Sequence, residues 1–172
     1  FARQGHRVGV VSPLLYRPWA AEAFLQHLPV TVKTVSILDR TKEHGSSREP
    51  LFLDVAATLQ EDPRYAGVKL LGGRYGLGSK EYTPSMAAAV FENAIGAQKD
   101  RFTIGIVDDV TFHSLPTSKH VTSIPASTTE CVFYGLAGDG TVGANKNAVK
   151  ILGDNSDLKA QAYFAYSSVK AG

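Results

Sequence analysis

Short apolar runs alternate with stretches of helical periodicity, and this alternation limits the fold more than any other feature of the chain. The apolar runs cover residues 8–11, 32–38, 68–71 and 103–107. The stretches with helical spacing cover residues 18–27, 51–60 and 84–95. A βαβαβαβ order with nearly continuous apolar strands predicts an α/β fold, in which a mostly parallel open sheet carries helices on both faces.

Residues with strong positional preferences mark the ends of these helices. Pro18 suits a first helical turn, where its missing N–H costs nothing. Thr83 followed by Pro84 predicts an N-cap and a first helical position. Pro63 ends the second helix, and the glycine-rich residues 72–78 predict a flexible turn.

A second pattern follows at residues 131–155, where a short apolar run (131–134) leads through a glycine-rich turn into a helix (144–152) that we expect Gly153 to end. Glycines in such a turn leave backbone N–H groups uncovered at a helix N-terminus. An anion there gains about 0.3 to 1 kcal/mol from the helix dipole. The alternative is a tight βα connection that binds nothing. The glycine spacing fits neither a dinucleotide fingerprint nor a P-loop.

A stretch rich in Ser, Thr and Pro (115–129) separates the two patterns and reads as a linker. We therefore expect one α/β domain over residues 1–120, a linker over 121–129 and the strand-loop-helix-strand start of a second α/β domain over 130–172. A piece of this size has a marginal core, so it should be the less stable one.

Five blocks resemble the pyruvate:ferredoxin (flavodoxin) oxidoreductase family, in the same order. They are LYRPWAAEAFLQHLP, ILDRTKEHGSSREPLFLDV, GGRYGLGSKEYTP, FTIGIVDDVTFHSLP and GLAGDGTVGANKNAVKILGDNSDLKAQAYFAYSSVKAG. The resemblance implies a transketolase C-terminal-like domain followed by the start of a coenzyme-A-binding domain of the 2-oxoacid oxidoreductase gamma type. It also implies that the chain is an internal fragment.

The family's activity is the oxidative decarboxylation of pyruvate to acetyl-CoA and CO2, so the resemblance implies an oxidoreductase of pyruvate and anaerobic metabolism. The implied cofactors are coenzyme A, thiamine diphosphate, Mg²⁺ and 4Fe-4S clusters, with all but coenzyme A outside this segment. Implied partners are ferredoxin or flavodoxin and a second copy in a homodimer. The alternatives are an NADP-linked fused pyruvate dehydrogenase, or a non-catalytic scaffold attached to a sulfite reductase.

The resemblance also assigns coenzyme A ligands, namely Gly138, Asp139, Gly140, Thr141, Val142 and Lys170. We interpret Asp139 as a structural member of the site, because its carboxylate and a diphosphate would repel each other. The carboxylate would cap a turn, or accept from ribose or from its own backbone. We predict neither catalytic residues nor metal ligands in this segment.

Other polar residues have structural explanations that we prefer. Residues 39–43 end a strand and read as a solvated loop, although ligands gather at that edge of a sheet. Arg74 and Tyr75 could position a neighbouring domain, but packing within their own domain is favoured. Asp108, Asp109 and His113 are too few for a metal site and suggest an interdomain corner.

Composition narrows the remaining possibilities. A net charge of +2, not gathered in one basic run, argues against nucleic acid. The single cysteine, Cys131, excludes an internal disulfide and a four-cysteine cluster, and we expect it to be a buried core thiol. The apolar runs are too short for a bilayer. We expect a soluble intracellular protein, cytoplasmic or in a mitochondrion-related organelle.

Overall fold

A three-stranded parallel sheet forms the centre of the first of two units into which the chain divides, Phe1–Thr122 and Ser123–Gly172. The computed structural model describes residues 1–108, 110–117, 119–136 and 138–166. The sheet has the order β1-β2-β3, with Thr34 of β1 opposite Lys69 of β2 and Gly73 of β2 opposite Phe102 of β3. The predicted α/β class with a parallel open sheet is confirmed.

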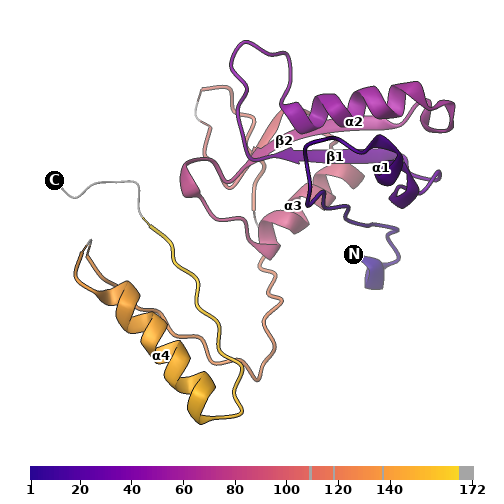
Figure 1. The fold of residues 1–172 in the computed structure, drawn as a ribbon. Helices are drawn as coiled ribbons and strands as arrows, with labels where there is room; N and C mark the ends of the chain where they lie inside the picture. The colour runs from indigo at the N-terminus through magenta and orange to yellow at the C-terminus, as the bar shows by residue number, and fades with distance from the viewer. Residues whose placement is uncertain (109, 118, 137, 167–172) are drawn as a thin grey trace. The chain divides into compact units, whose positions relative to one another are not determined.

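Strands and helices alternate along the first unit (Figure 1). The helices are α1 (Ala21–His27), α2 (Pro50–Glu61) and α3 (Pro84–Ile95), with 3-10 turns at Ala2–Gln4, Pro63–Tyr65 and Leu77–Ser79. The strands are β1 (Thr34–Asp39), β2 (Lys69–Tyr75) and β3 (Phe102–Ile104). The Thr83 side chain accepts a hydrogen bond from the Met86 amide at 3.3 Å, so the predicted cap of α3 is confirmed.

The two faces of the sheet are covered by different helices, as Figure 1 shows. On one face Ile37 packs with Phe52 and Val55 of α2 and with residues of α1. On the other face Leu71 packs with Ala89 and Val90 of α3. The connection from β1 through α2 to β2 and the connection from β2 through α3 to β3 both move one strand in the same direction across the sheet. Because α2 and α3 lie on opposite faces, the two connections have opposite handedness. One connection is therefore of the uncommon left-handed kind.

The core beneath α3 holds the largest fully buried side chains among the described residues. Leu71, Phe102 and Ile104 are fully buried, and each such side chain contributes about 1.5 to 3 kcal/mol through the loss of water contact. A Cβ atom on Gly73 would lie 2.3 Å from the Phe102 ring. Gly73 is therefore required by close packing.

This packing corrects the prediction of a flexible turn over residues 72–78. Gly72 and Gly73 belong to β2, where they let the rings of Phe52 and Phe102 approach the strand. The turn begins only at Gly76, which has a positive φ of 65°. Gly72 and Gly73 therefore allow close packing in the sheet, and Gly76 forms the turn.

Three further predictions of where strands and helices lie were wrong. Residues 8–11 form no strand, and Val10 is 81% exposed, because none of the strands that the structure describes pairs with them. Helix α1 begins at Ala21 and not at Pro18. Strand β3 stops at Ile104, since Gly105 has a positive φ of 67° and turns the chain out of the sheet.

The second unit consists of helix α4 (Thr141–Asn155) and the stretches before and after it. The helix continues past Gly153 to Asn155, so the predicted end was wrong. Residues 131–134 form no strand, and Cys131 is exposed, which corrects the expected buried thiol. None of the described residues of this unit is buried, because an isolated helix and two short stretches enclose no core.

Candidate functional site

The glycine-rich turn leads into α4 as predicted, but the helix begins at Thr141 and not at residue 144. Gly138 and Gly140 have φ values of 81° and 86°, in the left-handed region that glycine adopts without strain. Gly140 is the N-cap, and Thr141 is the first helical residue. The turn therefore places the first amides of α4 at its surface.

The carboxylate of Asp139 closes this turn. It accepts hydrogen bonds from the backbone amides of Leu136 and Thr141, both at 2.8 Å. The amide and hydroxyl of Thr141 and the amide of Leu136 lower the pKa of Asp139. The interpretation of Asp139 as a turn-capping residue is confirmed.

Gly135 is needed for the same closure. A Cβ atom at this position would lie 2.2 Å from the Thr141 hydroxyl oxygen and 2.7 Å from an Asp139 carboxylate oxygen. Contacts under 3.0 Å require a shift of the neighbouring atoms, so a larger residue would open the turn. Gly135 is thus a structural residue that the sequence pattern alone did not separate from the other glycines.

Two amides of the first helical turn remain available. The first bond of the helix joins the Ala144 amide to the Gly140 carbonyl at 3.0 Å, and none of the described residues accepts from the amides of Val142 or Gly143. A Cβ built on Gly138 or Gly140 meets nothing within 4 Å, so the space beside the turn is open. Open amides at the positive end of a helix suit an anion.

The stretch after α4 returns to the same end of the helix. The Lys146 ammonium lies 5.7 Å from the centre of the Phe164 ring, which brings residue 164 to the second turn of α4. Lys170, the predicted lysine of the site, follows six positions later but lies outside the described residues.

At the carboxyl end of the sheet in the first unit, Asp39 and Arg40 form hydrogen bonds that stabilise the fold. Asp39 is 6% exposed and accepts from the amides of Leu51 and Phe52 at 2.9 and 3.2 Å, which caps α2. Burial raises the pKa of Asp39, although these two amides act in the opposite direction. Arg40 donates to the Gly76 carbonyl at 3.2 Å.

Arg74 and Tyr75 also contact their own unit. The Arg74 side chain lies 3.8 Å from the Glu49 carboxylate, with both side chains 18% exposed. The ring of Tyr75 packs on Tyr82 with centroids 5.0 Å apart. Packing within the unit, the preferred explanation, is confirmed for both residues.

Asp108 and His113 form hydrogen bonds within the first unit. Asp108 accepts from the amides of Val110 and Thr111, and its hydrogen bonds to this loop hold its pKa well below the ordinary value. His113 Nδ1 lies 3.0 Å from the Arg101 carbonyl. Asp109 lies outside the described residues, and the residues that the structure does describe contain no group of three metal-ligating side chains.

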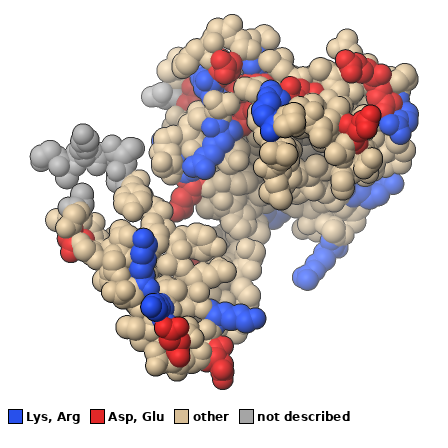
Figure 2. Space-filling view, in the orientation of Figure 1, with Lys and Arg blue, Asp and Glu red and all other residues tan. Residues whose placement is uncertain are grey.

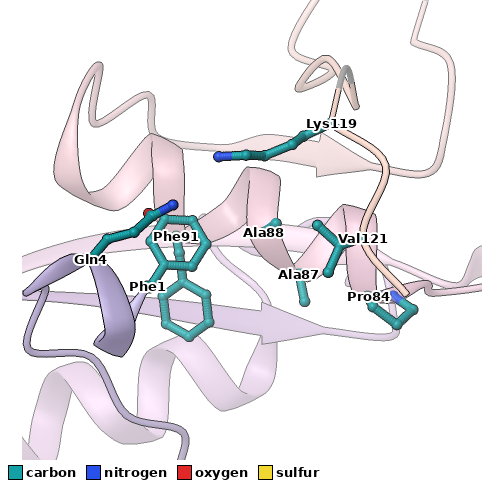
Figure 3. Close-up of a pocket in the computed structure, with 8 residues that line it drawn as sticks. All are labelled: Phe1, Gln4, Pro84, Ala87, Ala88, Phe91, Lys119 and Val121. Carbon is teal, nitrogen blue, oxygen red and sulfur yellow. The ribbon is translucent and has the colours of Figure 1, made fainter. Parts of the chain in front are cut away.

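A shallow groove of about 280 Å³ runs beside α3 (Figure 3). Its lining is apolar apart from Gln4 and Lys119, and the Phe1 and Phe91 rings lie 5.4 Å apart in it. Apart from the Lys119 amine, such a lining supplies no acid, base or nucleophile for chemistry.

Charge does not single out either unit as a nucleic-acid surface. On the face drawn in Figure 2, Lys and Arg are interspersed with Asp and Glu on both units. No helix within the described ranges is long and apolar enough to cross a bilayer.

Comparison with known proteins identifies the family. The chain is 51% identical over 170 residues to the pyruvate:ferredoxin oxidoreductase of Moorella thermoacetica, a match that covers 98% of this chain and 14% of that protein. It is 50% identical over 172 residues to the mitochondrial pyruvate dehydrogenase (NADP(+)) of Euglena gracilis, covering 99% and 10%. The chain belongs to the pyruvate:ferredoxin (flavodoxin) oxidoreductase family.

The match to the pyruvate-flavodoxin oxidoreductase of Nostoc sp. shows the same proportions. It reaches 47% identity over 181 residues, which covers 98% of this chain and 15% of the relative. The chain thus spans between 10% and 15% of the length of these curated relatives. No protein-family model matches the chain.

Proposed function

We propose that this chain works as part of an oxidoreductase that converts pyruvate and coenzyme A to acetyl-CoA and CO2. The observation that carries the proposal is identity near 50%, over almost every residue, to proteins named for pyruvate oxidation. Residues 1–120 would be the transketolase C-terminal-like domain and residues 130–172 the start of the coenzyme-A-binding domain. The first domain would support packing within the enzyme, and the second would bind coenzyme A.

The turn before α4 is the proposed site for a phosphate group of coenzyme A. The open amides of Val142 and Gly143 and the unobstructed space at Gly138 and Gly140 fit an anion at this helix end. Coenzyme A, when bound, supplies the thiol that receives the acetyl group. The residues of this chain would only hold and orient it.

Asp139 shapes the proposed site in a defined way. Its carboxylate already takes the Thr141 amide, so a phosphate would meet the neighbouring amides of Val142 and Gly143. Gly138, Gly140 and Thr141 keep the turn in this conformation, and Lys170 remains the proposed cation.

The other cofactors that the resemblance implies are thiamine diphosphate, Mg²⁺ and 4Fe-4S clusters, and a cluster does not fit this segment. The sequence contains one cysteine where a 4Fe-4S cluster takes four ligands. We propose that these cofactors belong to other parts of a longer enzyme, which acts as a homodimer.

The proposed electron acceptor is ferredoxin or flavodoxin, after the names of the Moorella and Nostoc relatives. An NADP-linked enzyme is the second candidate, because the Euglena relative at nearly the same identity carries that name. The enzyme would act in the cytoplasm, or in a mitochondrion-related organelle in a eukaryote, in line with the mitochondrial relative.

Replacing the proposed cation tests this site in the complete enzyme. We expect Lys170→Ala to raise the KM for coenzyme A about tenfold to a hundredfold, from the loss of a charge-assisted contact of about 1.5 to 3 kcal/mol. The KM for pyruvate should stay unchanged. Lys150→Ala, an exposed lysine further along α4, is the matched control and should change neither constant. An unchanged KM for coenzyme A in Lys170→Ala would remove this lysine from the site.

A further inference from the structure

Residues 119–121, which lie between β3 and the second unit, are docked along α3. We call these three residues the docked segment. Lys119 and Val121 line the groove beside α3 together with Ala87 and Ala88 of that helix (Figure 3). Part of the stretch rich in Ser, Thr and Pro (115–129) is therefore held against the first unit.

The hydroxyl group of Ser85, on the first turn of α3, holds the docked segment by its backbone. It accepts a hydrogen bond from the Val121 amide at 2.9 Å and donates one to the Val121 carbonyl at 3.3 Å. A hydroxyl can donate and accept at the same time, so one side chain pairs with both backbone groups of one residue. These bonds fix the path of the chain at this point, whatever side chain it carries.

The other contacts of the docked segment are weaker. The Lys119 ammonium lies 3.2 Å from the Glu92 carboxylate, but the two side chains are 52% and 41% exposed, and exposed ion pairs contribute little. The Val121 side chain is 36% exposed, so only part of its apolar surface is removed from water. The two hydrogen bonds of Ser85 are therefore the main hold on the docked segment.

The boundary between the two units follows directly after the docked segment. The first unit ends at Thr122 and the second begins at Ser123. Residues 123–136 are all exposed, and they include a local turn in which the Thr128 amide donates to the Pro125 carbonyl at 2.9 Å. Exposed stretches with few buried contacts are where local motion of a chain concentrates.

We propose that Ser85 is a latch that sets where the flexible joint between the two units begins. With Val121 held on α3, the joint begins after residue 122. With the latch open, it would begin after Leu115, whose amide donates to the Thr103 carbonyl of β3 at 2.8 Å. This inference concerns contacts within the first unit, so it stands or falls independently of the proposed function.

Limited proteolysis of the complete enzyme tests the latch. Trypsin can cut after Lys119 only when the docked segment leaves α3, so the cleavage rate follows the population of the open state. Ser85→Ala removes both hydrogen bonds, and alanine favours a helix at least as well as serine, so α3 should still form. We expect cleavage after Lys119, identified by mass spectrometry, to become about five to ten times faster. The midpoint of thermal unfolding should stay unchanged.

Ser85→Thr is the matched control, because it keeps the hydroxyl group. It should be cleaved after Lys119 at the rate of the unmodified enzyme. Equal rates for Ser85→Ala and the unmodified enzyme would overturn the proposal, and so would an equal acceleration in Ser85→Thr and Ser85→Ala.

Hydrogen exchange at the Val121 amide gives a second test that needs no protease during the reaction. In Ser85→Ala this amide loses its acceptor, so we expect its exchange in the complete enzyme to become about five to ten times faster. Lys119→Gln removes the ion pair but keeps both hydrogen bonds, so its effect should be smaller. A larger acceleration in Lys119→Gln than in Ser85→Ala would mean that the ion pair holds the docked segment, and the latch would be excluded.

Discussion

The two units of the chain reach their conformations by different means. In the first unit, two layers of apolar side chains are removed from water on either side of the sheet. In the second unit, α4 and the described residues around it bury no side chain, and order comes from a glycine turn, a capping carboxylate and helix hydrogen bonds. The difference between the units teaches that a local sequence pattern can specify a turn and a helix without specifying a core.

The exposed apolar residues of the second unit fit this difference. Tyr134, Leu136 and Tyr163 are 91%, 80% and 86% exposed. Local hydrogen bonds stabilise a short helix only marginally without a packed face. We therefore expect the first unit to dominate the measured stability of the chain.

The largest expected effect is in the core beneath α3. Phe102→Ala should lower the free energy of unfolding of the first unit by about 3 to 5 kcal/mol, because it leaves a cavity between β2, β3 and α3. Urea unfolding followed by the fluorescence of Trp19, the sole tryptophan, measures this unit directly. Ile151→Ala on α4, where the side chain is 61% exposed, should leave that transition unchanged. A loss of less than about 1 kcal/mol in the free energy of unfolding for Phe102→Ala would contradict the difference between the two units.

Acid should weaken the first unit through Asp100. Burial raises the pKa of Asp100, but hydrogen bonds from Arg48 and from the amides of Gly72 and Arg101 outweigh burial and lower the pKa to about 2. The stabilisation is complete above the unfolded-state pKa near 3.9 and is lost as the pH falls toward 2. Urea midpoints of the Trp19 transition between pH 5 and pH 2 measure this loss. Asp100→Asn should flatten the profile, and a profile equal to that of the unmodified chain would exclude Asp100 as its source.

The smallest expected effect lies in α4. Gly143→Ala should increase the helical content of α4, since a Cβ there meets nothing within 4 Å and alanine favours a helix over glycine by about 0.5 to 1 kcal/mol. Gly140→Ala is the matched control, because the same open space surrounds a φ of 86° that strains alanine. The ellipticity at 222 nm should therefore become more negative for Gly143→Ala and less negative for Gly140→Ala. Equal changes would mean that the backbone of this turn differs from the one described.

Sequence reasoning succeeded where the determining contacts are local. The Thr83 cap and the helix after it follow from residues three positions apart, and the role of Asp139 follows from a turn of six residues. Asp39 could not be assigned in this way, because it caps a helix that begins eleven positions later through a loop without a pattern. The strand character of Gly72 and Gly73 depends on rings brought from residues 52 and 102.

Parts of the candidate site remain predictions for a related reason. The turn from Gly138 to Val142 could be located from its glycines, but which amides stay free depended on where the Asp139 carboxylate points. Lys170 was assigned from the family resemblance, and its position lies outside the described residues. The exposure of Cys131 was missed because an apolar run predicts burial only when other strands lie beside it.

The opposite hands of the two crossovers make the small sheet a partition between independent packing layers. With equal hands, α2 and α3 would share one side, and Leu38, Leu71 and Phe102 would face solvent. As built, successive residues of β1 and β2 alternate between the layers, so the strand backbone separates the two sets of core side chains. Destabilising substitutions taken from different sides should then add almost independently, as expected for sites that share no contacts.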